Sequence, residues 1–184
     1  AWVEEAAELG LPNIRCSVDS IETLTTDKAV KLFEEFRVFT RAELESRVEI
    51  EYEAYAKTMN IEARTMLDMA GKQIVPAVIR YTTRLAQSIQ VVREACPEAD
   101  ISVQTELLLK TSRLLAEMKR ALSRLSDITE ACAAMEAGEA QAKAYYNQAV
   151  PAMDGLREPA DKLEMIVDKE LWPFPSYGDL IFEV

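Results

Sequence analysis

Apolar residues recur every three or four positions along the middle of the chain. The repeat continues for 48 residues in 13 steps, about 3.7 residues per step, which is close to the 3.6-residue turn of an α-helix. Its members are Leu44, Val48, Tyr52, Tyr55, Met59, Ala63, Met66, Ala70, Ile74, Val78, Tyr81, Leu85, Ile89 and Val92. The pattern predicts one long helix over 41–95 that buries a single face.

Local signals support this long helix and predict one bend in it. Thr40 followed by Glu43 has the spacing of a capping box, in which each side chain bonds a free backbone N–H of the first turn. Gly71 and Pro76 interrupt the helix. Because proline has no N–H and crowds the preceding turn, we expect a kink there rather than two separate helices, since the apolar repeat keeps its phase.

Further helical patterns cover most of the remaining chain. They lie at 1–9, 27–36, 101–136 and 139–170, whereas 13–26 has the composition of a loop. Residues 171–184 are rich in aromatic residues and proline, and we expect them not to be helical. The fold class is therefore all-α, an antiparallel bundle of long helices followed by a non-helical C-terminal tail.

Composition agrees with a helical fold, and the net charge argues against some classes of binding partner. The 184 residues include 49% hydrophobic residues but only 5 Gly and 7 Pro, which argues against sandwiches, barrels and disordered linkers. The net charge is −11, from 21 Lys and Arg against 32 Asp and Glu, and no basic stripe is visible. We therefore expect neither nucleic acid nor a membrane as a partner.

Cysteine usage bears on the redox compartment of the protein, and the start of the chain bears on whether it belongs to a longer protein. Cys16, Cys96 and Cys132 are scattered, with no metal-type spacing, as in proteins of a reducing compartment. The chain opens without an initiator Met and already in a helical pattern, so we expect it to belong to a longer protein.

Catalytic chemistry is not recognisable in the sequence. The chain contains no His, the commonest general base and metal ligand. The acidic run that includes Glu45, Glu49 and Glu53 is interpreted as a solvated helix face opposite the apolar repeat, although a metal cluster is the alternative. Cys96 before Pro97 has no His partner. We therefore assign no catalytic, cofactor-binding or metal-binding residue.

The aromatic tail allows two interpretations. Its side chains either fold back and close the bundle, or form an interface with a neighbouring domain or subunit. The candidate interface residues are Trp172, Phe174, Tyr177, Leu180 and Phe182.

An ordered series of short motifs resembles a known family. The segments that carry the resemblance are Trp2-Val3-Glu4-Glu5-Ala6 with Gly10-Leu11-Pro12-Asn13, Val38 to Arg47, Ile61-Glu62-Ala63, Met66-Leu67-Asp68-Met69, Ile74-Val75-Pro76-Ala77, Met153 to Arg157, Asp161 to Glu164 and Trp172 to Leu180. Together they resemble the C-terminal domain of type III glutamine synthetase, whereas 85–145 matches only in helical pattern.

The resemblance implies a parent enzyme that ligates ammonia to glutamate with ATP and Mg, as a cytoplasmic homo-oligomer. It implies a single helical domain here: 1–26 as the connector from an upstream catalytic domain, 27–170 as the bundle and 171–184 as a docking tail. The family's ligands for metal, ATP and glutamate precede this segment, so no residue is carried over and the fragment itself is not expected to be active. The alternative is a free-standing helical module that binds a partner or ligand.

Overall fold

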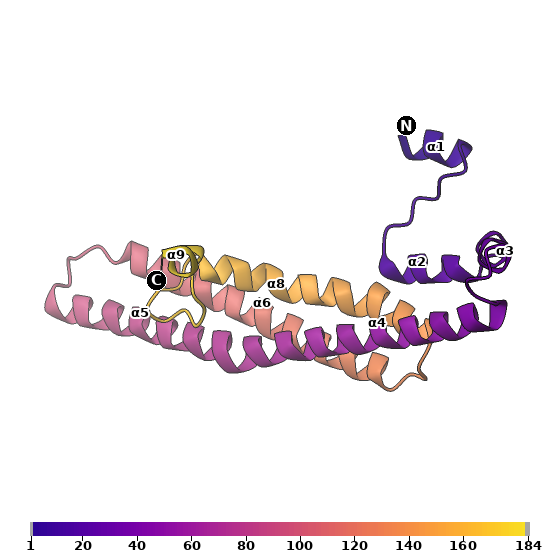
Figure 1. Cartoon of the computed structure of the whole chain (residues 1–184). Helices are drawn as coiled ribbons and strands as arrows, with labels where there is room; N and C mark the ends of the chain where they lie inside the picture. Colours follow the sequence, from indigo (N-terminus) through magenta and orange to yellow (C-terminus); the bar gives the residue numbers. More distant parts are fainter. Residues whose placement is uncertain (1, 183–184) are drawn as a thin grey trace. The chain divides into compact units, whose positions relative to one another are not determined.

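A computed structural model of the chain describes residues 2–182, apart from the side chain of Tyr177, and its regular structure is helical throughout (Figure 1). The α-helices are α1 (Trp2–Glu8), α2 (Ser17–Glu22), α3 (Asp27–Glu35), α4 (Arg41–Met69), α5 (Val75–Ala95), α6 (Ser102–Ala133), α7 (Glu139–Ala144), α8 (Val150–Glu164) and α9 (Tyr177–Phe182). A 3-10 turn, η1 (Thr23–Thr25), and two π-turns, η2 (Ala70–Ile74) and η3 (Tyr145–Ala149), complete them. The predicted all-α class is confirmed.

The chain divides into two compact units. The first comprises residues up to Ile61 together with Ala131–Gln148, and the second comprises Glu62–Glu130 together with the residues from Ala149 on. The long helices α4 and α6 each contribute residues to both units. Each unit has a hydrophobic cluster of its own.

The first unit is organised around α2, in a segment that the sequence predicted to be a loop. That prediction over 13–26 was wrong. Val18 and Ile21 of α2 are buried against Val48 and Tyr52 of α4 and against Ala142 of α7. This burial stabilises a six-residue helix that has little stability alone, because isolated short helices are marginal in water.

A second interaction joins α2 to α7 in this unit. Lys143 of α7 forms ion pairs with Glu139 of the same helix and with Glu22 of α2, the latter at 3.2 Å. Hydrogen bonds to these two carboxylates raise the pKa of Lys143 above its usual value. The cation therefore stays charged throughout the physiological range.

The predicted capping box at the start of α4 is confirmed. The Glu43 carboxylate accepts from the backbone N–H of Thr40 at 2.7 Å, and the Glu43 N–H donates to the Thr40 hydroxyl at 3.4 Å. The bonds from Thr40 lower the pKa of Glu43. Arg47, one turn on, lies with its guanidinium 4.2 Å from the centre of the Phe39 ring.

The second unit is an antiparallel bundle. In Figure 1, α5 and α6 run side by side in opposite directions, and α8 runs back along α6. Its core includes Val78 of α5, Met118 and Leu125 of α6, and Leu156 and Leu163 of α8. All 14 members of the predicted apolar repeat, across both units, are buried or half-buried, which confirms the helical face that the spacing indicated.

Proline is accommodated by π-turns rather than by breaks. Pro76 lies in the first turn of α5, directly after η2, where the Val75 N–H donates to the carbonyl of Ala70, five residues back. Pro151 follows η3 in the same way. The wider turn places the residue without an N–H at the start of a new α-helical segment, where the missing donor costs little. Pro159 lies inside α8 and is buried.

The predicted ends of two helices were too late. The helix predicted over 101–136 ends at Ala133, so Met135, expected in its apolar face, is exposed. Gly138 lies between the two helices as the N-cap of α7, at a positive φ of 133°. The region predicted over 139–170 is helical only to Glu164, and Val167 remains buried without helical structure.

Candidate functional site

The tail after α8 starts with two aromatic side chains that face inward. Trp172 and Phe174 are half-buried and pack against the core of the second unit. Their ring centres are 6.4 Å apart with planes at 78°, an edge-to-face arrangement. These two residues therefore follow the first of the two predicted alternatives, in which the tail folds back on the bundle.

The end of the tail is helical, contrary to the prediction for 171–184. Ser176 and Asp179 form a capping box for α9: the Asp179 carboxylate accepts from the backbone N–H and the hydroxyl of Ser176, at 2.8 Å and 2.7 Å. Lys169 donates to the same carboxylate at 2.5 Å. The hydrogen bonds from Lys169 and Ser176 lower the pKa of Asp179 to about 2.

The apolar side chains of α9 face outward. Leu180 is 66% exposed, Ile181 67% and Phe182 81%. The side chain of Tyr177 lies outside the described residues. Of the five candidate interface residues, Trp172 and Phe174 are therefore half-buried on the bundle, whereas Leu180 and Phe182 belong to an exposed apolar end.

One ion-pair cluster fixes the start of the tail to α5. Arg84 lies 3.4 Å from Asp168 and 3.9 Å from Glu170, both in the turn that follows α8. The Asp168 carbonyl also accepts from the backbone N–H of Trp172 at 3.0 Å. The turn is thereby held so that Trp172 reaches the core.

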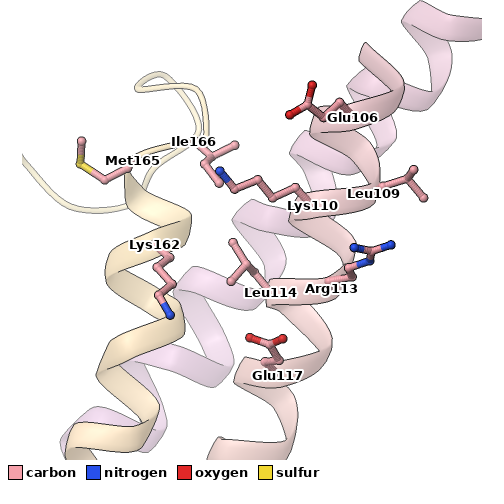
Figure 2. A pocket seen from close by; sticks show the side chains of 9 residues that line it. All are labelled: Glu106, Leu109, Lys110, Arg113, Leu114, Glu117, Lys162, Met165 and Ile166. Carbon is pink, nitrogen blue, oxygen red and sulfur yellow. The ribbon is translucent and has the colours of Figure 1, made fainter. Parts of the chain in front are cut away.

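An open groove of about 820 Å³ lies between α6 and the end of α8 (Figure 2). Lys110 and Leu114 of α6 point across it toward α8, and Lys162 points into it from α8. Lys162 is paired with Glu158 at 2.6 Å, whereas Lys110 has no ion-pair partner in the described chain. Glu106 and Glu117 also line the groove, so it combines charges of both signs with an apolar wall.

This groove was missed in the sequence, where no basic stripe was recognised. Helix α6 has five Lys and Arg against four Asp and Glu, so no large excess of charge marks the groove in the sequence.

The acidic run of α4 borders a surface groove. Glu45, Glu49 and Glu53 border a groove with Val48 and Tyr52, so they flank the buried face of α4 instead of lying opposite it. Glu45 and Glu49 are solvent-exposed, and Glu53 pairs with Lys57 at 2.5 Å. Among residues 2–182 no group of three or more His, Cys, Asp or Glu is placed to hold a metal ion.

The cysteines have separate environments. Cys132 is buried, Cys96 is exposed, and Cys16 is partly exposed. The Sγ of Cys16 accepts from the backbone N–H of Asp19 at 3.4 Å and so caps α2. Among the three cysteines, Cys132 alone is a buried side chain.

Comparison with known families identifies the chain. The family model described as glutamine synthetase C-terminal domain matches residues 1–93, half of the sequence. The chain belongs to this family. The resemblance suggested by the sequence motifs is confirmed, including in the part that carries α1 to α5.

Individual glutamine synthetases match over nearly the whole chain. The chain is 32% identical to a glutamine synthetase of Butyrivibrio fibrisolvens over 184 residues, all of this chain and 26% of that protein. It is 32% identical to a glutamine synthetase of Bacteroides fragilis, over 98% of this chain and 25% of that protein. A type-3 glutamine synthetase of Dictyostelium discoideum is 27% identical over similar shares. The chain thus spans about a quarter of the length of these relatives.

The structure also shows whether any described helix could span a membrane. None of the helices within residues 2–182 is long and apolar enough to cross a membrane.

Proposed function

We propose that this chain is the C-terminal helical, non-catalytic portion of a type III glutamine synthetase, which ligates ammonia to glutamate with ATP. In this proposal the two units support domain packing or subunit contacts. ATP and Mg²⁺ are bound by parts of the enzyme outside these 184 residues. The observation that carries the proposal is the end-to-end match to glutamine synthetases four times as long.

The tail supplies the contact surface in this proposal. Trp172 and Phe174 anchor the segment on the bundle, and α9 then presents Leu180, Ile181 and Phe182 to solvent. Adjacent large apolar side chains on a surface mark interaction sites. We propose that they contact the catalytic region of the same polypeptide or another subunit of a homo-oligomer in the cytoplasm.

The proposal is tested on the full-length enzyme with the triple variant Leu180→Ser, Ile181→Ser, Phe182→Ser. We expect a smaller assembly in analytical ultracentrifugation or an enzyme that loses activity at lower temperature, with unchanged helix content. The matched control is Val91→Ser with Val103→Ser, two exposed apolar residues on α5 and α6. An unchanged assembly and thermal inactivation in the triple variant would count against the tail as a contact surface.

A further inference from the structure

Helix α1 has one apolar side and one acidic side. Trp2, Ala6 and Leu9 follow one another at helical spacing and therefore lie along one side of the helix. The backbone N–H of Leu9 donates to the carbonyl of Glu5 at 3.2 Å, so the helical hydrogen bonding continues to this residue. The carboxylates of Glu4 and Glu8 lie on the opposite side.

A specific motif ends this helix. Gly10 has a positive φ of 76°, and its N–H donates to the carbonyl of Ala7 at 3.0 Å. The N–H of Leu11 donates to the carbonyl of Ala6, five residues back, at 2.9 Å. These two bonds and the left-handed glycine form a Schellman motif. The end of α1 therefore has a fixed local conformation, although residues 11–15 that follow have no regular structure.

The described chain leaves the apolar side of α1 uncovered. Trp2 is 75% exposed and Leu9 is 74% exposed. Among residues 2–15 only Ala6 is buried, and no residue of α1 belongs to either hydrophobic cluster of the described chain. Because an isolated helix of seven residues is marginal in water, a helix with this apolar side requires a covering surface.

We infer that the apolar side of α1 packs on the catalytic region that precedes residue 1 in the same glutamine synthetase polypeptide. This inference rests on the proposed function. The first argument for this occupant is the amount of chain outside the structure and its position. The relatives are about four times as long as this chain, and the family model that matches from residue 1 is described as a C-terminal domain. Most of the polypeptide therefore precedes α1.

The second argument is covalent attachment, which favours this occupant over another subunit. Helix α1 begins at Trp2, the second residue of the matched region, so the preceding polypeptide is joined directly to it. A short connection gives the attached region a millimolar effective concentration at the apolar side of α1. Another subunit must instead reach the same side by diffusion. With its apolar side covered in this way, α1 leaves the carboxylates of Glu4 and Glu8 in water.

Site-specific photo-cross-linking of the full-length enzyme tests the inference. The photoreactive amino acid p-benzoylphenylalanine replaces Trp2 or Leu9 in separate variants, and mass spectrometry identifies the residue that becomes linked. We expect links to residues that precede residue 1, in a product that keeps the mass of one chain on a denaturing gel. Glu8 is the matched control, since it is exposed on the other side of the same helix and the probe there should give few links. Products of twice the chain mass, or equal yields at all three positions, would overturn the inference.

Amide hydrogen exchange of the full-length enzyme provides the second readout. Trp2→Ser with Leu9→Ser is compared with Glu5→Ser with Glu8→Ser, which also places two serines at exposed positions but leaves the apolar side intact. We expect the first pair to speed exchange of the α1 amides by about tenfold or more, because a short helix opens once it loses its covering surface. The second pair should change this exchange much less. Equal effects of the two pairs contradict the inference.

The failures can be told apart. A full-length protein without glutamine synthetase activity would overturn the proposed function and this inference together. An active enzyme in which the probes at Trp2 and Leu9 do not link to the preceding polypeptide would overturn the inference alone. If both probes link only to another subunit, α1 belongs to the subunit contact, so the proposed function stands and the inference fails.

Discussion

The first unit buries five residues in its hydrophobic cluster, whereas the second unit buries eleven. The second cluster also has 14 partly buried apolar neighbours, from α4, α5, α6, α8 and the tail, whereas the first has 4. In the first unit, large apolar side chains such as Trp2, Leu9 and Phe36 remain on the surface. The second unit thus has the larger hydrophobic core, and both units leave apolar side chains on the surface.

The smaller cluster is supplemented by polar interactions. Arg41 pairs with Asp27 at 2.9 Å, and Lys143 joins α2 to α7. Exposed ion pairs of this kind contribute only about 0–1 kcal/mol each, whereas a fully buried Leu or Met contributes about 1.5–3 kcal/mol. Because its hydrophobic cluster is smaller, we expect the first unit to have the lower local stability.

The largest expected effect comes from the core of the second unit. Leu125→Ala removes a fully buried side chain of α6 and should lower the free energy of unfolding by about 3 kcal/mol, through lost burial and the resulting cavity. Urea unfolding followed by circular dichroism measures it. Val103→Ala, at an exposed position of the same helix, should change it by less than about 0.5 kcal/mol. Equal effects of the two changes would contradict the burial described here.

A smaller and more local effect is expected in the first unit. Ile21→Ala should cost about 2 kcal/mol, and this loss should appear in α2 and α7, because Ile21 belongs to the cluster that joins them to α4. Amide hydrogen exchange should show faster exchange in these helices and unchanged protection of α6 between Leu114 and Leu125. If protection falls equally in both units, they unfold as one and the comparison fails.

Two glycines should respond in opposite directions. Gly155 lies inside α8 with no atom within 4 Å of an added Cβ, so Gly155→Ala should stabilise the second unit by about 1 kcal/mol. Gly10, after α1, has a φ of +76°, so Gly10→Ala should destabilise the first unit by about 1 kcal/mol despite the open space. Thermal unfolding of the two variants measures both signs, and the same sign in both would contradict these backbone conformations.

The smallest expected effect concerns pH and α9. The pKa of Asp179 is lowered to about 2 in the folded chain, against about 3.9 for an unperturbed Asp. Its contribution is therefore present above about pH 4 and is lost as the pH falls through about 2. Nuclear magnetic resonance should show the Asp179 carboxyl titrating near pH 2 and the α9 amides losing protection in that range. Asp179→Asn should lower the hydrogen-exchange protection of the α9 amides already at neutral pH. Unchanged protection in this variant would show that the hydrogen bonds from Lys169 and Ser176 to Asp179 do not hold α9 in place.

Long-range pattern made the main helices predictable. The apolar repeat from Leu44 to Val92 and the Thr40–Glu43 box correctly predicted the course and start of the long helix, because helical spacing and capping are local properties. The helix α2 could not be predicted in this way, since Val18 and Ile21 are stabilised by Val48, Tyr52 and Ala142, which are distant in sequence.

The candidate site was only partly predictable. The aromatic tail stood out by composition, but its division into inward Trp172 and Phe174 and outward Leu180 and Phe182 depends on the bundle surface that receives it. Ser176 and Asp179 have the spacing of a capping box, which was overlooked beside the prolines. The groove between α6 and α8 was not predictable, because it exists only where α8 packs on α6.

The sequence by itself determined the all-α class, the buried face of the long helix and the family, because periodicity and motif order are properties of the linear sequence. Tertiary structure alone decided that the chain forms two units, that the segment before Asp27 is helical, and that Pro76 and Pro151 follow π-turns without a break. These features depend on which faces meet across long separations in sequence. The free energy of that burial outweighs local propensity wherever the two disagree.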